Sequence, residues 1–105
     1  MIYIIREAAR KKLLFLPHAV RQMNQPANMI STMEVHEVVM NGDLIEDYPE
    51  DIRGHSCLLA GDTSKGRVVH AVCSPKDGYL AIITAYVPEP RKWEEGGRKR
   101  RSVVP

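Results

Sequence analysis

The pattern of apolar and polar positions begins with a helical period. Apolar residues recur every three or four positions in the first segment, at Ile2, Ile5, Ala9 and Leu13. This spacing predicts an amphipathic helix over residues 2–14. The apolar run that follows stops at Pro17, and residues 18–24 can form a short helix that Pro26 ends. The N-terminal part of the chain is therefore predicted to be helical.

A capping signal marks the start of another helix. Ser31 stands three residues before Glu34, which is the spacing of a capping box, and valines follow at helical spacing. Asn41 and Gly42 form a pair that is typical of a left-handed helix end. The sequence predicts a helix over residues 32–40.

Beyond Gly42 the period changes from helical to alternating. The predicted strands are residues 44–48, 56–61, 67–73 and 79–87. Turn-forming segments, DTSKG and SPKDG, separate the last three strands. Acidic residues crowd the first strand, which suits a sheet edge, whereas the last is almost wholly apolar and suits a central position. The predicted fold is α+β, with N-terminal helices packed on one face of a mainly antiparallel four-stranded sheet.

Alternation divides the last two strands into two faces, if the SPKDG segment pairs Cys73 with Tyr79. One predicted face carries Val68, His70, Val72, Leu80, Ile82, Thr84 and Tyr86. The other carries Val69, Ala71, Cys73, Ala81, Ile83 and Ala85, with Cys57 and Leu59, and its small apolar side chains suit helix packing.

The first face holds the candidate site, because His70, Thr84 and Tyr86 are its convergent polar groups. An imidazole exchanges protons near neutral pH, and a phenol can donate to a phosphate oxygen. The structural alternative is a buried histidine or tyrosine that satisfies one hydrogen bond in the core.

Composition indicates one small domain with a basic end. The chain has 105 residues and a formal net charge of +2, and the four basic residues from Arg98 to Arg101 supply +4, which leaves −2 for the rest. We predict a single domain over residues 1–95 and a basic, flexible tail over residues 96–105. Clustered cations favour contact with nucleic acid or an acidic partner, and a solvated terminus is the alternative.

Several classes of protein fit poorly. No stretch approaches the roughly twenty apolar residues of a membrane span, and two cysteines do not make a disulfide framework. The N-terminal apolar residues precede the charged ones, opposite to a secretory signal, so a cytoplasmic protein is expected.

No cofactor or metal is predicted either. Zinc ligand types occur at His55, Cys57, His70 and Cys73, but His70 and Cys73 are expected on opposite faces of a strand. The acidic side chains between residues 43 and 51 are explained by solvation and by protection of an edge strand, and are left out of the site.

Four segments carry a resemblance to a known family: PHAVRQM, GDLIEDYPED, RVVHAVCS, and IITAYVPEPRKWEE followed by RKRR. With these segments in order, the chain resembles the domain of unknown function 4258, a group of small bacterial proteins. The resemblance implies a compact α+β fold similar to the RelE and barnase-like toxin ribonucleases, and a role as the toxin of a two-gene module with a zinc-finger antitoxin. The residues it singles out are His18, Arg21, His70, Thr84, Tyr86, Trp93 and the terminal arginines. The loop NQPANM is longer than the family's usual join.

The predicted function is therefore that of a toxin that acts on RNA as a metal-independent endoribonuclease. Candidate catalytic residues are His70, Tyr86, His18, Arg21 and Thr84, and candidate nucleic-acid-binding residues are Arg67, Arg91, Lys92, Trp93, Arg98, Lys99, Arg100 and Arg101. The alternatives are a non-catalytic RNA- or ribosome-binding module, in which Trp93 stacks on a base, and a protein-interaction module. The expected partners are RNA, the ribosome or a small antitoxin-like protein, with no membrane.

Overall fold

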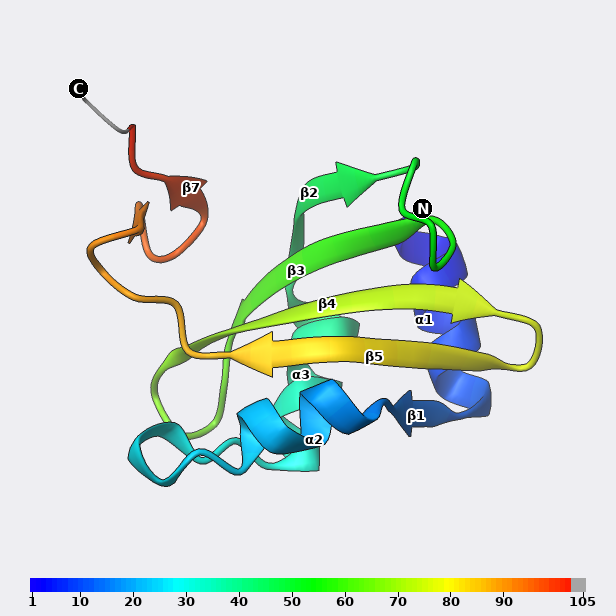
Figure 1. The fold of residues 1–105 in the computed structure, drawn as a ribbon, viewed down its shortest axis with the longest axis horizontal. Coiled ribbons are helices and arrows are strands. Elements are labelled where there is room, and N and C mark those ends of the chain that lie inside the picture. The colour runs from blue at the N-terminus through cyan, green and yellow to red at the C-terminus, as the bar shows by residue number, and fades with distance from the viewer. Residues whose placement is uncertain (103–105) are drawn as a thin grey trace.

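The computed structural model describes residues 1–102 and has an α+β fold, as predicted (Figure 1). Its helices are α1 (Ile2–Lys11), α2 (Pro17–Met23), the 3-10 turn η1 (Pro26–Asn28) and α3 (Thr32–Asn41). Its strands are β1 (Leu13–Phe15), β2 (Asp43–Tyr48), β3 (Ser56–Asp62), β4 (Val68–Lys76), β5 (Tyr79–Tyr86), β6 (Trp93–Glu94) and β7 (Lys99–Arg100). The main sheet has the order β1-β5-β4-β3-β2, and β6 pairs with β7 separately.

The prediction of four strands is wrong, because the main sheet has five and is mixed. The first helix, expected to reach residue 14, ends at Lys11, and β1 pairs in parallel with β5. The amide of Leu80 donates to the carbonyl of Lys12 at 2.8 Å, and the amide of Leu16 donates to the carbonyl of Ile82 at 3.0 Å. These long-range bonds satisfy the backbone of residues 13–15. The segment is wholly apolar, so as a continuation of the helix it would have no polar face for solvent.

The predicted capping box of α3 is present and is tied into the fold by a buried ion pair. Glu34 is 1% exposed; it accepts from the Ser31 amide, the Thr63 hydroxyl and the Arg67 guanidinium. Arg67, through its hydrogen bonds, holds the pKa of Glu34 down at about 2 against the cost of burial. The pair joins α3 to the turn between β3 and β4.

Gly42 does not end α3 in the left-handed conformation that its position predicts, since its φ is −80°. Its role is to let the end of α3 approach β3 closely. A Cβ atom there would lie 2.5 Å from the carbonyl oxygen of Val38 and 2.6 Å from that of Ala60. Only a glycine therefore lets the end of α3 pass this close to β3.

The predicted pairing of Cys73 with Tyr79 is wrong. β4 continues to Lys76, which lies opposite Tyr79, and Cys73 lies opposite Ile82. An irregularity near Val72 and Cys73 leaves one extra residue on β5, which reverses the alternation of that strand.

The bulge redistributes the faces of β5. Leu80 and Ile82, predicted on the open face, lie in the core under the helices, whereas Ala81 and Ile83 are outside that core. On β4 the prediction holds, and His70 and Cys73 lie on opposite faces. His70 pairs with Tyr86, and Val72 pairs with Thr84, so the three polar residues share the face away from α1, as predicted.

Candidate functional site

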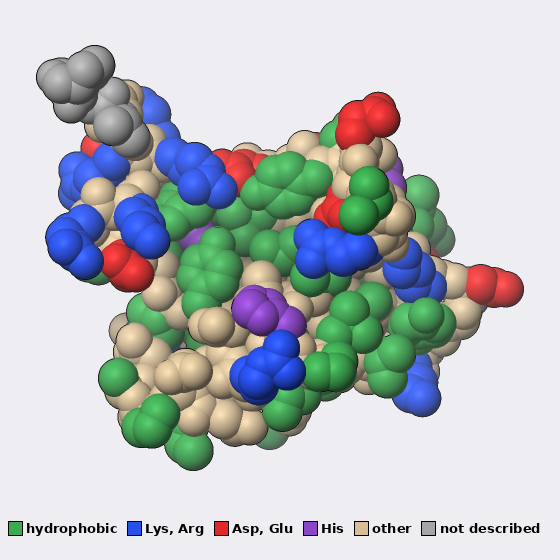
Figure 2. Space-filling view, in the orientation of Figure 1, with side chains coloured by type: hydrophobic (Ala, Val, Ile, Leu, Met, Phe, Trp, Pro, Cys, Tyr) green, Lys and Arg blue, Asp and Glu red, His purple; other side chains and the backbone are tan. Residues whose placement is uncertain are grey.

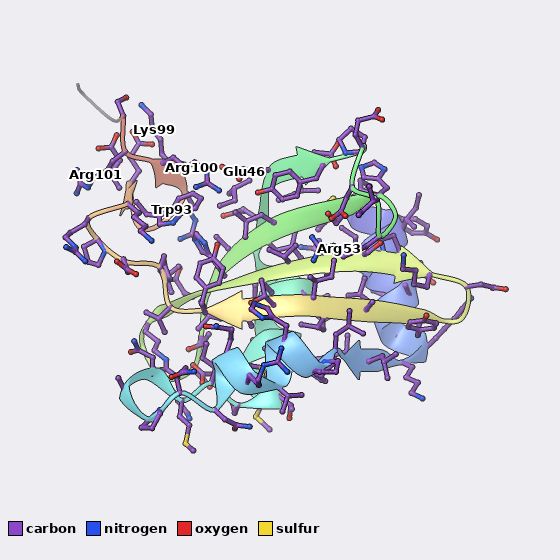
Figure 3. All side chains as sticks on the ribbon, viewed as in Figure 1. Glu46, Arg53, Trp93, Lys99, Arg100 and Arg101 are labelled. Carbon is purple, nitrogen blue, oxygen red and sulfur yellow. The ribbon has the colours of Figure 1, made fainter. Side chains whose placement is uncertain are left out.

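The C-terminal hairpin β6–β7 folds back over one end of the open sheet face (Figures 1 and 3). The predicted boundary between residues 95 and 96 falls inside this hairpin. Arg98 contacts Asp43 on β2 at 3.0 Å and Asp62 on β3 at 3.4 Å. Part of the predicted tail, residues 103–105, lies outside the described residues.

His70 lies beneath the hairpin and is fully buried. Its Nε2 atom is 2.6 Å from the carbonyl oxygen of Gly97, and its Nδ1 atom is 3.3 Å from the hydroxyl of Tyr86. Because a carbonyl only accepts, Nε2 carries the hydrogen and Nδ1 accepts from Tyr86. Burial lowers the pKa of His70, so the neutral ring with both nitrogens engaged is the form at neutral pH.

The indole of Trp93 closes this cluster. Its ring meets the imidazole of His70 edge to face at 4.5 Å, and the guanidinium of Arg100 stands 4.6 Å from its ring centre. Trp93 is only 5% exposed. The stacking role expected from the sequence would therefore need a ring face that is free of its contacts with His70 and Arg100.

Gly97 is the residue that lets the hairpin backbone reach His70. Its φ is +82°, and a Cβ atom there would lie 3.1 Å from the Val68 side chain and 3.2 Å from that of Pro88. A larger side chain would lift the Gly97 carbonyl from the imidazole.

Arg100 fastens the hairpin to the sheet edge (Figure 3). Its Nε and Nη2 atoms bind the two oxygens of Glu46 at 2.6 and 3.0 Å, and Tyr48 also donates to Glu46. Arg100 lowers the pKa of Glu46, whereas burial and the Glu46 carboxylate raise the pKa of Tyr48 to about 12. The pair is partly exposed, with 58% of the Arg100 side chain and 24% of the Glu46 side chain accessible.

A pocket of about 400 Å³ opens beside this cluster, between the hairpin and the end of α2. Its lining comprises Gln22, Gln25, Asn28, Tyr86, Val87, Glu89, Lys92, Trp93 and Arg100. The lining therefore combines three side-chain amides, two cations, one carboxylate and a phenol. Around the hairpin, basic side chains crowd the surface with fewer acidic ones between them (Figure 2).

The structure brings only some of the predicted residues together. Those at the pocket or directly behind it are His70, Tyr86, Lys92, Trp93 and Arg100. Thr84 is half-buried on the same sheet face, but it does not line the pocket. His18 and Arg21 are exposed on α2 and do not line the pocket either.

The remaining predicted cations are distributed over the surface. Arg67 is engaged with Glu34, and Arg91 is exposed. Lys99 and Arg101 lie near Glu94 on the hairpin, Lys99 at 4.0 Å and Arg101 at 3.1 Å. Each of these cations has a carboxylate within ion-pair distance.

Sequence reasoning missed the amides of the pocket and Glu46. Gln22, Gln25 and Asn28 lie in and beside the loop that was noted only for its length. Their amide-rich composition was the available signal, because amides present both donors and acceptors. Glu46 was set aside with its acidic neighbours, and nothing local in the sequence distinguishes it from them.

Fold and site define a small α+β protein with a polar pocket built from side chains of α2, the adjoining loop and the C-terminal hairpin. Residues 15–87 match the family Domain of unknown function (DUF4258), so the chain belongs to this family. The match ends at Val87, and the hairpin with its PEPRKWEE segment lies outside it. No curated protein and no solved structure matches the chain. Among residues 1–102, none of the helices has the length and apolar character needed to cross a membrane.

Proposed function

We propose that the chain binds single-stranded RNA, with one nucleotide held in the pocket beside Tyr86, as an RNA-directed toxin of a toxin–antitoxin module. The observation that carries this proposal is the composition of the pocket, whose lining combines the cations of Lys92 and Arg100 with three side-chain amides and a single carboxylate, that of Glu89. Cations suit a phosphate, and amides can pair with the edge of an unstacked base.

The charges at the pocket are free enough to meet a phosphate. The side chains of Lys92 and Arg100 are 69% and 58% exposed. Exposed ion pairs contribute only about 0–1 kcal/mol, so a phosphate can compete with Glu89 or Glu46 for these cations. The toxin part of the proposal draws its support only from the likeness to RelE and barnase-like ribonucleases expected from the sequence, because the description of the family assigns it no function.

Fluorescence anisotropy with a short labelled RNA tests the binding. Arg100→Gln removes a cation and also breaks the hairpin clasp, so Glu46→Gln is its matched control, because it breaks the same ion pair but keeps the cation. We expect Arg100→Gln to weaken binding and to reduce the slope of log K against log salt by about 1. Glu46→Gln should bind at least as tightly as the wild type.

Lys11→Gln on α1 is a second control, since it makes the same change in net charge on an exposed helix. Equal weakening in Lys11→Gln and Arg100→Gln would mean that only net charge attracts RNA, and would contradict a pocket. Weakening in both Glu46→Gln and Arg100→Gln would assign Arg100 to the hairpin clasp.

A second candidate function is metal-independent RNA cleavage, favoured by the contact between Tyr86 and His70 at the pocket wall. The phenol of Tyr86 lines the pocket and could take the proton of an attacking 2′-hydroxyl while its own proton passes to Nδ1 of His70, with the leaving 5′-oxygen taking a proton from water. Arg100 would then meet the charge that develops on the phosphate.

Induced expression in a bacterial host tests the toxin role. The wild type should slow growth, and Arg100→Gln should relieve this effect at an equal protein level. If RNA is cut in vitro, Tyr86→Phe should lose cleavage but keep RNA affinity. Harmless expression together with uncut RNA would leave only the binding proposal.

A further inference from the structure

A second polar cluster lies on the edge strand β2 and the start of β3. Asp47 and Cys57 are direct cross-strand partners, and Cys57 belongs to the core on the helix side of the sheet. Glu46, its neighbour in sequence, instead faces the hairpin through Arg100. This second cluster is therefore separate from the pocket beside Tyr86.

Three side chains of different chemistry converge in this cluster. The Oδ1 atom of Asp47 lies 2.5 Å from Nε2 of His55 and 3.2 Å from Sγ of Cys57. All three ligand atoms lie within 4.8 Å of one another. Without a metal, hydrogens on the sulfur and nitrogen atoms fill the space between these atoms and Asp47. The three ligand atoms are therefore already grouped around the position that a metal ion would take.

A nucleophilic role for Cys57 fits this geometry poorly. His55 contacts Asp47 rather than the sulfur, so the thiol is paired with a weakly basic carboxylate and not with an imidazole. Cys57 is fully buried and its sulfur donates a hydrogen to Asp47, so the thiol hydrogen is held in place where no metal is bound. A coordinating metal ion, in contrast, removes the proton of a thiol outright.

We infer that Asp47, His55 and Cys57 bind a divalent transition-metal ion, and that their sulfur, nitrogen and oxygen donors suit Zn²⁺. Tetrahedral zinc binds sulfur at about 2.3 Å and nitrogen or oxygen at about 2.0–2.2 Å. Ligand atoms around such an ion therefore stand roughly 3–4 Å apart.

The side chains can reach this spacing with small movements. Cys57 is fixed in the core, whereas the side chains of Asp47 and His55 are 47% and 41% exposed and can rotate apart. The Ser74 hydroxyl donates to the His55 carbonyl at 2.8 Å, which fixes the backbone of that ligand.

Two of the three ligands are partly exposed, so water or a substrate can reach a fourth coordination position beside them. Three protein ligands with an open position are typical of zinc sites that bind water or a substrate, rather than of closed structural sites. The zinc reading set aside from the sequence combined His55 and Cys57 with His70 and Cys73. The β2–β3 pairing replaces the latter two with Asp47.

Cobalt substitution tests the site directly. Chelator-treated full-length protein, kept reduced, is titrated with Co²⁺, which reports sulfur coordination through a thiolate-to-cobalt charge-transfer band and tetrahedral geometry through its visible bands. We expect one equivalent to bind with both signatures, and Zn²⁺ to displace it. His55→Gln should weaken binding by more than about a hundredfold, since even outer-shell changes cost ten- to hundredfold.

Cys73→Ser is the matched control. Cys73 is equally buried and lies directly across from Cys57, but it is not part of the three-residue cluster. Cys57→Ser should abolish the charge-transfer band, whereas Cys73→Ser should keep it. Asp47→Asn and His55→Gln change exposed side chains, so both should remain folded by circular dichroism.

Three results would overturn the proposal: no charge-transfer band, a band that depends on Cys73, or Co²⁺ affinity unchanged in both Asp47→Asn and His55→Gln. Each of these measurements is independent of RNA binding. The fate of the metal site and that of the pocket are therefore decided separately.

Discussion

Two glutamate–arginine pairs with nearly the same geometry hold two very different parts of the molecule. Glu34 and Arg67 form a bidentate pair with distances of 2.8 and 2.9 Å, and Glu46 and Arg100 form one at 2.6 and 3.0 Å. The Glu34 side chain is 1% exposed, whereas that of Glu46 is 24% exposed. Geometry alone therefore does not assign a role to an ion pair, and burial of the carboxylate does.

The difference follows from what each carboxylate loses if its arginine leaves. Glu34 would remain as a buried charge, with the Thr63 hydroxyl and the Ser31 amide still donating to it and the Lys65 ammonium 3.6 Å away. Glu46 would be hydrated at the sheet edge. The inner pair is thus part of the fold, and the outer pair is a clasp that can open when the hairpin moves.

Breaking the inner pair should have the largest effect. Glu34→Gln leaves the Arg67 guanidinium without its carboxylate and should lower the free energy of unfolding by about 3 kcal/mol. Urea denaturation followed by circular dichroism measures this loss. Glu46→Gln is the matched variant and should cost less than about 1 kcal/mol. Equal losses in the two variants would contradict the comparison.

Acid should break the pair of Glu34 and Arg67 over a defined range of pH. The pKa of Glu34 is lowered from an ordinary 4.5 to about 2, so its contribution is full above about pH 4.5 and is lost as the pH falls toward 2. This shift corresponds to about 3 kcal/mol. Urea denaturation at several pH values measures the dependence. Glu34→Gln should flatten the curve in that range, and a slope that persists in the variant would assign it to other carboxylates.

The elements that local sequence signals could predict are those whose causes are local. The capping box of Ser31 and Glu34 determines where α3 begins, and alternation with turn residues locates β3, β4 and β5. β1 was missed because its three residues become a strand only through pairing with Leu80–Ile82, far along the chain. The faces of β5 were misassigned because one bulge reverses the alternation.

The candidate site could be predicted only in part, because some of its contacts have local causes and others depend on residues far apart in the sequence. The shared face of His70 and Tyr86 follows from alternation, but the cover over His70 comes from Gly97 and from Arg100, which pairs with a carboxylate 54 residues earlier. A run of basic residues predicts a solvated tail unless those acidic partners are known. The pocket amides likewise gain their position from the docking of α2 against the end of β5 and the hairpin.

His70 and Tyr86 separate a structural role from a chemical one. His70→Gln should lower the free energy of unfolding by about 1–3 kcal/mol, because it removes the buried ring contact with Trp93 and disturbs the bond to Gly97. Tyr86→Phe removes a hydroxyl at the pocket wall and should cost about 1 kcal/mol or less. Thermal unfolding measures both changes.

If RNA is cleaved, its rate of cleavage gives a sharper comparison of these two variants. A catalytic Tyr86 predicts a loss of roughly a hundredfold or more in Tyr86→Phe at nearly unchanged stability. If the activity of each variant is reduced only as far as its folded fraction is reduced, both residues support the hairpin and neither takes part in the chemistry.

The smallest expected effect on stability concerns the clasp, and the single tryptophan makes it visible. Trp93, on strand β6 of the hairpin, is 5% exposed and packs against His70, with Arg100 against its ring. Glu46→Gln should release Arg100 and let the hairpin open more often, so that Trp93 emission shifts to the red and acrylamide quenches it more strongly. High salt should produce a similar change in the wild type, because it screens a partly exposed pair. Glu34→Gln, measured where it is still folded, is the control and should leave quenching unchanged. Quenching that stays at the wild-type level in Glu46→Gln would mean that the contacts of Gly97 and Arg98 hold the hairpin closed. The ion pair between Glu46 and Arg100 would then contribute nothing measurable to that closure.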